Sequence, residues 1–407
     1  MIVYHPPGFW KEKRITLGVS GGIAAFKVAQ VVSYLAQVGA RVEVVMTQSA
    51  LQFVGRATFE ALSGNPVRCS LFEEGEKIPH ISIPRESQGI LVAPATANIL
   101  GKMARGIADD LLSTILLVAP EKVIVAPAMN RAMWSNPLVQ ENLKIIASLG
   151  AGVVEPEEGA LACREEGKGR LPSWEILVES LFYHCYPEKP LKDKKVLVVA
   201  GATREWLDPV RFISNSSSGM MGCALAAQAK ADGAQVSMVT GQTSVRFPAG
   251  VEVEKVDTAT EMFQLVSRRF PDCDICFMVA AVTDYRPAFF SSEKIKKNLH
   301  SSFSLSLVLN PDILSWMGTN KRSDQIVVGF CAETNQPLEF ARQKLEQKKV
   351  DLMVANLVGR ADTGFQTPTN KAWIVDSLNN ERELPLLDKR DLAREIIDHI
   401  ASYFING

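Results

Sequence analysis

Short apolar runs alternate with amphipathic stretches along the first 186 residues of the chain. The runs are rich in β-branched residues and have the length of buried parallel strands; they fall at residues 15–19, 41–46, 90–93 and 123–126. Stretches with helical spacing follow them, at residues 26–35, 98–106 and 109–114. This regular alternation of strand and helix predicts a doubly wound α/β domain around a parallel sheet.

The same pattern restarts in the second half of the chain. Two prolines and a run of charges at residues 187–194 indicate a linker. Apolar runs then recur at residues 196–200, 236–240, 275–281, 326–330, 351–355 and 372–375, with helical stretches at 222–231, 338–348 and 390–404. We therefore expect two α/β domains, at residues 1–186 and 195–407, the second one also doubly wound and Rossmann-like.

The length and charge of the chain agree with two domains and exclude some partners. With 407 residues, the chain exceeds the roughly 250–300 residues at which a single core stops growing. Its 47% content of apolar residues is enough to fill two cores. A formal net charge of -1 argues against a nucleic-acid binder. No apolar run approaches the ~18 residues of a membrane span.

Seven cysteines, an odd number, are scattered along the chain. Reduced thiols in a cytoplasmic protein are the simplest interpretation, and residues 1–10 lack the features of a signal peptide. Cys273 and Cys276 form a C-x-x-C pair that leads into a predicted strand, where residues three apart face opposite sides. We therefore expect neither zinc binding nor redox chemistry from this pair.

Small polar residues stand at three strand ends of the first domain. Ser20 opens a Ser-Gly-Gly turn, and Thr96 and Asn130 follow two later strands. Open α/β sheets bind their ligands at this edge, and backbone amides at a helix start suit a phosphate, as does the hydroxyl of Thr47. Because clustered histidines or carboxylates are missing here, the edge favours a planar, phosphorylated cofactor over a metal.

Two of these features have ordinary structural alternatives. Asn130 can instead cap the helix that follows it. The glycine-spaced loop at residues 157–170 is typical of a lid over a site, and it holds Cys163. A lone cysteine is more often an inert apolar filler, yet a mobile polar loop is a poor place for one.

Polar groups also follow predicted strands in the second half. The turn at residues 211–219 is rich in amides and hydroxyls, and lysines dominate the loop at residues 294–297. Pro311 suits the first turn of a helix that starts within residues 310–313. Lys344 and Lys348 lie one turn apart on a predicted helix and share a face, which in most proteins is simply solvated.

These motifs, in this order, resemble the bifunctional phosphopantothenoylcysteine decarboxylase/phosphopantothenate–cysteine ligase family of bacterial coenzyme A synthesis. In the first half the matching pieces are Ser-Gly-Gly-Ile-Ala-Ala at 20–25, Ala-Pro-Ala-Thr-Ala-Asn at 93–98, Ala-Asp-Asp-Leu-Leu-Ser-Thr at 108–114 and Pro-Ala-Met-Asn-x-x-Met-Trp at 127–134. In the second half they are Gly-Ala-Thr-Arg-Glu at 201–205, Asp-Pro-Val-Arg-Phe-Ile-Ser-Asn-x-Ser-Ser-Gly at 208–219, Ala-Ala-Val-x-Asp-Tyr at 280–285, Lys-Ile-Lys-Lys at 294–297 and Asn-Pro-Asp-Ile at 310–313. The resemblance therefore covers nearly the whole chain.

For the first domain the resemblance implies a flavodoxin-like, FMN-dependent decarboxylase that converts 4'-phosphopantothenoylcysteine to 4'-phosphopantetheine. Loss of a carboxylate needs an electron sink, which a flavin supplies. By position, His80 is implied as the base beside the substrate thiol, Asn130 as the group that binds the departing carboxylate, and Cys163 as a proton donor. A base beside the thiol contributes roughly 10²–10⁴-fold. Without the resemblance, His80 would be read as a surface histidine in a polar loop.

The resemblance also implies a set of FMN contacts and shows two departures from the family pattern. The implied FMN positions are Ser20, Gly21, Gly22, Ile23, Thr47, Pro94, Thr96, Asn98, Ser113 and Met129. Pro84 stands where the family usually continues a regular helix, and Arg164 stands where glycine is usual.

For the second domain the resemblance implies a ligase that joins cysteine to 4'-phosphopantothenate through an acyl-cytidylate made from CTP. Mg²⁺ and lysines would offset the charge of the triphosphate. Lys294 matches a mobile-loop lysine with a catalytic and CTP-binding role, and Asn215 matches the residue associated with turnover of the acyl-cytidylate. The other implied CTP positions are Ala280, Asp284, Asn310, Pro311, Asp312, Ile313, Phe330, Lys344 and Lys348. Met220 stands where the family usually has lysine.

Other functions agree with only part of this pattern. A decarboxylase of peptidyl cysteine fits the first domain but not the fused second one. A non-catalytic regulator fits the fold but not the joint presence of His80, Asn130 and Cys163. A NAD-dependent dehydrogenase is disfavoured because G-x-G-x-x-G is missing. The family also implies a homo-oligomer, with trimeric contacts in the decarboxylase part and dimeric contacts in the ligase part.

Overall fold

The chain forms two compact units, and each is described here by itself. The computed structural model describes residues 2–72, 78–160, 166–296, 303–359, 364 and 366–405. One unit spans Gly8–Pro187, and the other combines Glu188–Gly407 with Met1–Pro7. The boundary thus falls at Pro187, and the first seven residues group with the C-terminal unit.

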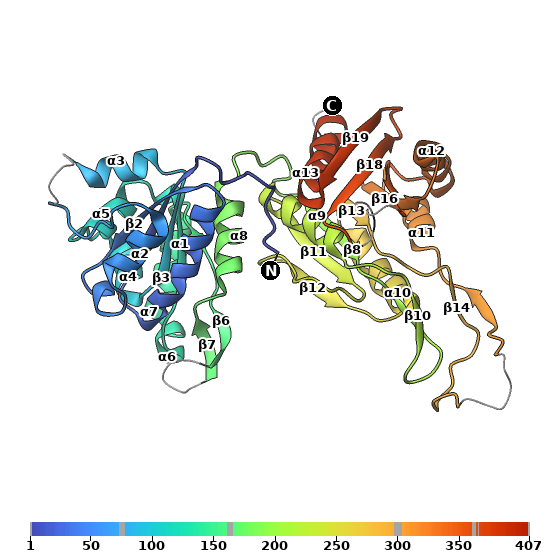
Figure 1. The fold of residues 1–407 in the computed structure, drawn as a ribbon, viewed down its shortest axis with the longest axis horizontal. Coiled ribbons are helices and arrows are strands. Elements are labelled where there is room, and N and C mark those ends of the chain that lie inside the picture. Colours follow the sequence, from blue (N-terminus) through green and yellow to red (C-terminus); the bar gives the residue numbers. More distant parts are fainter. Residues whose placement is uncertain are drawn as a thin grey trace. The chain divides into compact units, whose positions relative to one another are not determined.

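The N-terminal unit, coloured blue to green in Figure 1, is built around a five-stranded parallel sheet. The strand order of this sheet is β2-β1-β3-β4-β5. Its strands are β1 (Arg14–Val19), β2 (Arg41–Met46), β3 (Gly89–Ala95), β4 (Val123–Pro127) and β5 (Gly152–Val153). Its α-helices are α1 (Val28–Gln37), α2 (Arg56–Ser63), α3 (Pro79–Glu86), α4 (Ala97–Arg105), α5 (Leu111–Val118), α6 (Arg131–Trp134), α7 (Pro137–Ser148) and α8 (Trp174–Cys185). A short 3-10 helix, η1 (Ile23–Lys27), precedes α1.

Helices cover both faces of this sheet because its strands are apolar on both sides. On one face, Ile90 and Val92 of β3 belong to a buried cluster that includes residues of α4, α5 and α7. On the other face, β3 approaches α8 so closely that a Cβ on Gly89 would come within 2.2 Å of the Cys185 sulfur. Helices on both faces of a parallel sheet confirm the doubly wound class.

The C-terminal unit holds an eight-stranded sheet with the order β12-β11-β8-β13-β16-β17-β18-β19. These strands are β8 (Lys195–Ala200), β11 (Gln235–Thr240), β12 (Glu252–Lys255), β13 (Ile275–Met278), β16 (Ile326–Glu333), β17 (Leu352–Leu357), β18 (Thr369–Asp376) and β19 (Glu381–Asp388). Four further strands form two short ribbons: β9 (Arg204–Trp206) with β10 (Phe212–Ser214), and β14 (Tyr285–Pro287) with β15 (Leu307–Leu309). Its α-helices are α9 (Met220–Ala231), α10 (Ala259–Arg269), α11 (Ile313–Asn320), α12 (Pro337–Lys348) and α13 (Lys389–Ile400).

The sheet of the C-terminal unit is parallel from β12 to β17, which fits the predicted Rossmann-like pattern. It is mixed overall, because β17 pairs with β18 and β18 with β19 in antiparallel fashion. The turn between β18 and β19 explains the reversal: Asp376 accepts from the N–H groups of Leu378 and Asn380. A turn this short joins only antiparallel strands.

Residues 188–194, expected as a linker, pack onto the C-terminal unit. Leu191 is fully buried, and its N–H donates to the carbonyl of Asp232 at 3.0 Å. The first residues of the chain are anchored to the same unit, since the Tyr4 hydroxyl donates to the carbonyl of Arg246 at 2.6 Å. Both segments therefore pack as parts of the C-terminal unit.

Two local predictions are wrong. Helix α11 begins at Ile313 with Asp312 as its N-cap, accepting from the Ser315 N–H at 3.0 Å, so Pro311 precedes the cap and does not occupy the first turn. The glycine-spaced loop expected at residues 157–170 instead contains two antiparallel strands, β6 (Glu157–Ala160) and β7 (Glu166–Arg170), which form a hairpin. Helix α3 likewise replaces the polar loop considered as an alternative for His80.

Within the described part of the chain, no helix combines the length and the apolar character needed to cross a membrane.

Candidate functional site

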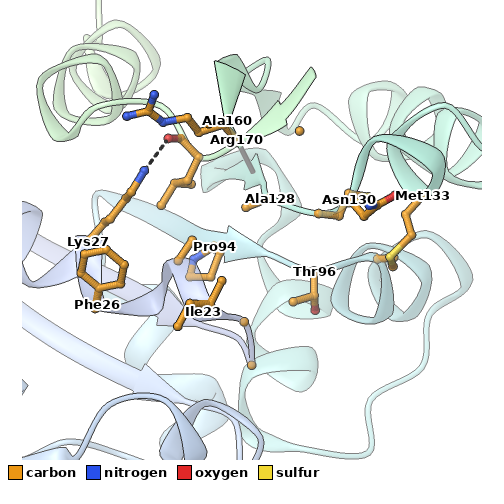
Figure 2. A pocket seen from close by; sticks show the side chains of 17 residues that line it. Ile23, Phe26, Lys27, Pro94, Thr96, Ala128, Asn130, Met133, Ala160 and Arg170 are labelled. Atoms are coloured by element: carbon orange, nitrogen blue, oxygen red, sulfur yellow. Dashed lines mark hydrogen bonds between the residues drawn. The ribbon is translucent and has the colours of Figure 1, made fainter. Parts of the chain in front are cut away.

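A cavity of about 460 Å³ opens at the carboxyl ends of β1, β3 and β4 in the N-terminal unit (Figure 2). The described residues that line it come from the glycine turn after β1, from the ends of β3 and β4, and from the β6–β7 hairpin: Gly21, Gly22, Ile23, Ala24, Phe26, Lys27, Pro94, Thr96, Ala97, Ala128, Met129, Asn130, Met133, Ala160, Gly169, Arg170 and Leu171. This is the edge at which open α/β sheets bind ligands.

Seven of the residues implied by the sequence line this cavity: Gly21, Gly22, Ile23, Pro94, Thr96, Met129 and Asn130. The capping interpretation of Asn130 is confirmed, and the residue also lines the cavity. Its side-chain oxygen accepts from the Ala132 N–H at 2.7 Å, which caps α6, and the same residue faces the cavity. The cap fixes the orientation of the amide at the edge of the site.

Ser20 lies behind the lining and holds two strand ends together. Its hydroxyl donates to the Pro94 carbonyl at 2.7 Å, and it accepts from the Thr96 N–H at 3.1 Å. With 2% of its surface exposed, Ser20 positions Thr96 and does not itself border the cavity.

The other implied residues of this unit also lie outside the described lining. The Ser113 hydroxyl accepts from the Asp110 N–H at 3.1 Å and completes the capping box of α5. Thr47 accepts from the Ala50 N–H at 3.3 Å, and Asn98 is exposed on the first turn of α4. His80 occupies the second position of α3; its Nδ1 is buried and has no hydrogen-bond partner among the described residues. Cys163 and Arg164 lie outside the described residues.

The β6–β7 hairpin closes over the cavity by direct backbone contact. The Met129 N–H donates to the carbonyl of Gly169 at 3.0 Å. A Cβ on Gly169, whose φ is +148°, would lie 2.2 Å from the Met129 oxygen. The glycine spacing of this segment therefore reflects the close approach of the hairpin to the end of β4.

A second cavity, of about 340 Å³, lies in the C-terminal unit between the start of α9 and the ends of β13 and β16. The predicted residues that line it are Asn215, Ala280, Asp284, Phe330 and Lys344. The Asn215 amide donates to the Val282 carbonyl at 3.0 Å, which fixes its side chain. Gly219 has a φ of +76°, so it admits the tight turn that starts α9.

The two lysines of α12 are engaged differently. The Lys344 ammonium donates to Glu333 at 2.8 Å; burial alone would lower the pKa of Lys344, but this bond and nearby charges raise it. Lys348 pairs with the carboxylate of Asp312 and is not part of the lining. The shared helix face predicted for the two lysines thus meets two different acidic partners.

The remaining implied CTP residues are not among the described residues that line this cavity. Asn310 donates to the Thr283 carbonyl at 2.8 Å and so supports the chain beside Asp284. Pro311, Asp312 and Ile313 lead into α11, and Lys294 is exposed on the loop after β14. Lys297 lies outside the described residues.

Asp208 anchors the loop of Lys294, a role that the motif alone did not reveal. Its buried carboxylate accepts from the Arg211 N–H at 2.8 Å, from the Arg211 guanidinium, and from the Ile295 N–H at 3.1 Å. Burial alone would raise the pKa of Asp208, but these hydrogen bonds hold it well below its usual range. The position of Ile295, next to Lys294, is therefore set by a charged hydrogen-bond network.

The structure adds cations that sequence reasoning did not single out. Lys27 and Arg170 line the first cavity, and Lys389 lines the second. Lys389 is 2% exposed, and burial lowers its pKa to about 8. In the sequence, Lys389 directly follows Asp388, a residue type that caps helices, but the burial of Lys389 depends on the packing of α13.

The described residues contain no group of three or more His, Cys, Asp or Glu side chains placed to hold a metal. Cys273 and Cys276 are both buried, and Gln325 donates to the Cys273 sulfur at 3.3 Å. The C-x-x-C pair is thus part of the core of the C-terminal unit.

Both halves of the chain match known protein families. Residues 6–184 match the family model described as flavoprotein, and residues 191–404 match the DNA/pantothenate metabolism flavoprotein C-terminal domain. The fold and these matches define a two-domain α/β protein in which a flavoprotein domain precedes a ligase domain.

Curated relatives identify the family more closely. The coenzyme A biosynthesis bifunctional protein CoaBC of Bacillus subtilis is 42% identical over 396 residues, which cover 96% of this chain and 97% of the relative. The protein of the same name from Borreliella burgdorferi is 38% identical over 389 residues, or 95% and 98% of the two chains. A crystal structure of the C-terminal domain of a CoaBC protein covers 54% of this chain and 100% of its own, at 34% identity and a TM-score of 0.46.

The chain therefore belongs to the CoaBC family of bifunctional coenzyme A biosynthesis enzymes, which combine a flavoprotein decarboxylase domain with a ligase domain. The resemblance inferred from the motifs is confirmed.

Proposed function

We propose that the N-terminal unit binds FMN in its cavity and decarboxylates 4'-phosphopantothenoylcysteine, and that the C-terminal unit joins cysteine to 4'-phosphopantothenate with CTP and Mg²⁺. The observation that carries the first half is the cavity at the ends of β1, β3 and β4, with Asn130 held at its edge. The product of the second reaction is the substrate of the first, which explains why one chain holds both units.

The walls of the first cavity fit a flavin. Apolar side chains such as Ile23, Phe26 and Met133 suit a planar ring, and Thr96 adds a hydroxyl at one side (Figure 2). The turn after β1 runs close to the segment after β2, because a Cβ on Gly21 would lie 2.4 Å from the Ser49 Cβ. The turn therefore has no side chain at Gly21 and presents its backbone to the ligand. When bound, FMN supplies the oxidation of the substrate thiol on which loss of carbon dioxide depends.

Asn130 is proposed to bind the carboxylate that leaves. Its oxygen accepts from Ala132, so its NH₂ group is the part that a carboxylate can meet, and it brings no charge that would repel the substrate. His80 as base and Cys163 as proton donor rest on the motif match, since His80 lies outside the described lining and Cys163 outside the described residues.

In the second cavity, Ala280, Asp284, Phe330 and Lys344 are proposed to bind CTP, and Asn215 to act on the acyl-cytidylate. Mg²⁺ is usually held by one or two carboxylates together with phosphate oxygens, and Asp284 is the carboxylate among the described lining residues. The remaining implied residues, namely Lys294, Asn310, Pro311, Asp312, Ile313 and Lys348, are proposed to complete the site from its surroundings.

We also propose a cytoplasmic homo-oligomer with trimeric decarboxylase contacts and dimeric ligase contacts. The β14–β15 ribbon and its flanks expose large apolar side chains, with Phe289 84%, Phe303 66% and Leu309 68% exposed. Monomeric proteins rarely leave such a cluster in water, so it supports a contact between ligase units. The six cysteines among the described residues are thiols and form no disulfide bond, which fits a reducing compartment.

Two assays test the proposal separately. The purified protein should show a flavin absorption spectrum and release carbon dioxide from 4'-phosphopantothenoylcysteine without CTP. The ligase half should release pyrophosphate over many turnovers only when CTP, Mg²⁺, cysteine and 4'-phosphopantothenate are all present, because without cysteine the reaction stops at the acyl-cytidylate. A colourless protein that stays inactive after reconstitution with FMN would refute the decarboxylase half. Sustained pyrophosphate release that proceeds equally fast with and without cysteine would refute the ligase half.

A further inference from the structure

The N-terminal segment, residues 2–7, packs into the C-terminal unit and not into the unit that follows it in sequence. It groups with residues 188–407. Val3, Tyr4 and His5 are 2%, 1% and 4% exposed. The first residues of a domain are usually poorly ordered unless contacts tie them down, so burial of three consecutive residues points to a specific docking site.

One contact of the N-terminal segment is with the start of α13. The Arg390 guanidinium donates to the Val3 carbonyl at 3.2 Å and to the two oxygens of Asp388 at 2.8 and 3.0 Å. Asp388 in turn caps α13 by accepting from the Arg390 N–H at 2.9 Å. Because a planar guanidinium donates in fixed directions, these bonds fix the first turn of α13 against the segment.

Lys389 lies between these two residues and lines the second cavity. Its ammonium donates to the Gly364 carbonyl at 2.9 Å, and its N–H donates to the Pro368 carbonyl at 2.9 Å. The attraction between a cation and a bound anion depends on the distance between them. The bonds made by Asp388 and Arg390 on either side therefore set how far this cation reaches into the cavity.

A second contact is with the loop between β11 and β12. The Tyr4 hydroxyl donates to the Arg246 carbonyl at 2.6 Å, and the Arg246 guanidinium donates to the Ile2 carbonyl at 3.3 Å. The same guanidinium lies 5.7 Å from the centre of the Tyr4 ring. These contacts hold the loop by both backbone and side chain.

The loop between β11 and β12 also supports another wall of the second cavity. The Ser244 N–H donates to the Ser218 carbonyl at 3.1 Å, and a Cβ on Gly219 would lie 2.5 Å from the Thr243 side chain. Ser218 and Gly219 line the cavity. The N-terminal segment thus contacts the two parts of the unit that carry Lys389 and back the turn before α9.

We infer that the N-terminal segment is a positioning element of the ligase site, which fixes the start of α13 and thereby holds Lys389 where it can meet the anionic part of the nucleotide. The inference rests on the proposed function of the C-terminal unit, because it assumes that the second cavity binds CTP. Catalysis at phosphoryl groups depends on cations held at set positions, so a support of this kind affects binding without touching the ligand.

A segment that only stabilised the unit would act differently. Loss of stability lowers the fraction of folded protein and so reduces the binding of every ligand alike. Displacement of a cation weakens only the ligands that carry phosphates. Cytidine shares its base and ribose with CTP but has no phosphate, so the two ligands together separate a positioning role from a purely structural one.

The test compares the full-length protein with a chain that lacks residues 2–7, with Arg390→Lys and with Arg394→Gln. Lysine keeps a positive charge beside Asp388 but does not donate in the three directions that Arg390 uses. Arg394→Gln is a matched control, because Arg394 lies on the same helix and pairs with Asp391 but does not line the cavity.

Affinities for CTP and for cytidine are measured by calorimetry with Mg²⁺ and without 4'-phosphopantothenate, so that no reaction occurs. KM for CTP and kcat are then measured from pyrophosphate release. Lys389→Met is tested alone and together with removal of residues 2–7. If both changes remove the same interaction, their effects are not additive.

We expect removal of residues 2–7 to raise Kd and KM for CTP about ten- to a hundredfold, and Arg390→Lys to raise them about three- to tenfold, as for loss of a hydrogen bond from a charged group. Kd for cytidine should change by less than about twofold, as should all values for Arg394→Gln. In the Lys389→Met background, removal of the segment should add less than about a further twofold.

Unchanged affinity for CTP, an equal loss of affinity for cytidine, or a fully additive loss in the combined variant would overturn the inference. If the shortened chain does not fold, the CTP-to-cytidine ratio of Arg390→Lys decides in its place. If the unaltered full-length protein neither binds CTP nor releases pyrophosphate from it, the proposed function itself fails.

Discussion

Replacing Asn130 by aspartate separates the structural role of this residue from its proposed role in decarboxylation. Aspartate keeps an oxygen that can accept from the Ala132 N–H, so the cap of α6 is retained. It also places a negative charge where the substrate carboxylate is expected. Two like charges about 4 Å apart repel by about 4 kcal/mol at an effective dielectric constant near 20. The rate should therefore fall roughly 10³-fold.

The assay measures carbon dioxide release and, in the same preparation, pyrophosphate release by the ligase unit. The ligase rate is an internal control, because its cavity lies in the other unit. Asn130→Ala provides a second comparison: loss of the cap costs about 1 kcal/mol, which lowers Tm by about 2–4 °C. If Asn130→Asp decarboxylates at more than a tenth of the original rate, with flavin bound, the proposed contact with the carboxylate is wrong.

Three further predictions follow from buried polar groups. Asp208→Asn should slow the ligase at least about tenfold while leaving decarboxylation unchanged. The reason is that a hydrogen bond from the Ile295 N–H to a charged group contributes about 1.5–3 kcal/mol. An unchanged rate of pyrophosphate release would contradict the anchoring role of Asp208. Burial lowers the pKa of His5 to about 4, so the folded state resists a proton that the unfolded chain takes up near pH 6.5. Stability should therefore be complete above pH 6.5 and decline by up to about 3 kcal/mol toward pH 4, and His5→Gln should flatten this part of a plot of Tm against pH. Ser20→Ala removes the hydroxyl that bonds to the Pro94 carbonyl and to the Thr96 N–H, and it should destabilise the N-terminal unit by about 1–3 kcal/mol. This loss is measurable as a fall in Tm and in bound flavin, and unchanged values of both would refute the bridging role of Ser20.

Most elements of both sheets could be predicted from the sequence because strand and helix periodicity is a local property. The apolar run at residues 15–19 differs from β1 by one residue, and the predicted helix at 338–348 differs from α12 by one residue. The reversal at β18 and β19 escaped prediction, although Asn379, with a φ of +68°, is a residue type that favours such turns. Periodicity identifies a strand but not the direction in which it runs.

The site was predictable where its residues directly follow strand ends and less so where side chains of other elements meet. The glycine turn, Thr96 and Asn130 follow strand ends, so the shared edge of a parallel sheet brings them together. Lys348 illustrates the limit, because its helical spacing is more often that of a solvated face than of a ligand contact, and only folding pairs it with Asp312. Ser113 likewise matches a family position while its hydroxyl completes a helix cap.

The two-domain α/β class, the family and the polar residues at the sheet edge can be inferred from the sequence, because each depends on patterns within short stretches of chain. Which cations reach the two cavities depends on how the chain folds. Lys27 and Arg170 belong to elements far apart in sequence, and their meeting depends on the β6–β7 hairpin packing against the end of β4. Such contacts are set by the close packing of the folded chain and have no local signal in the sequence.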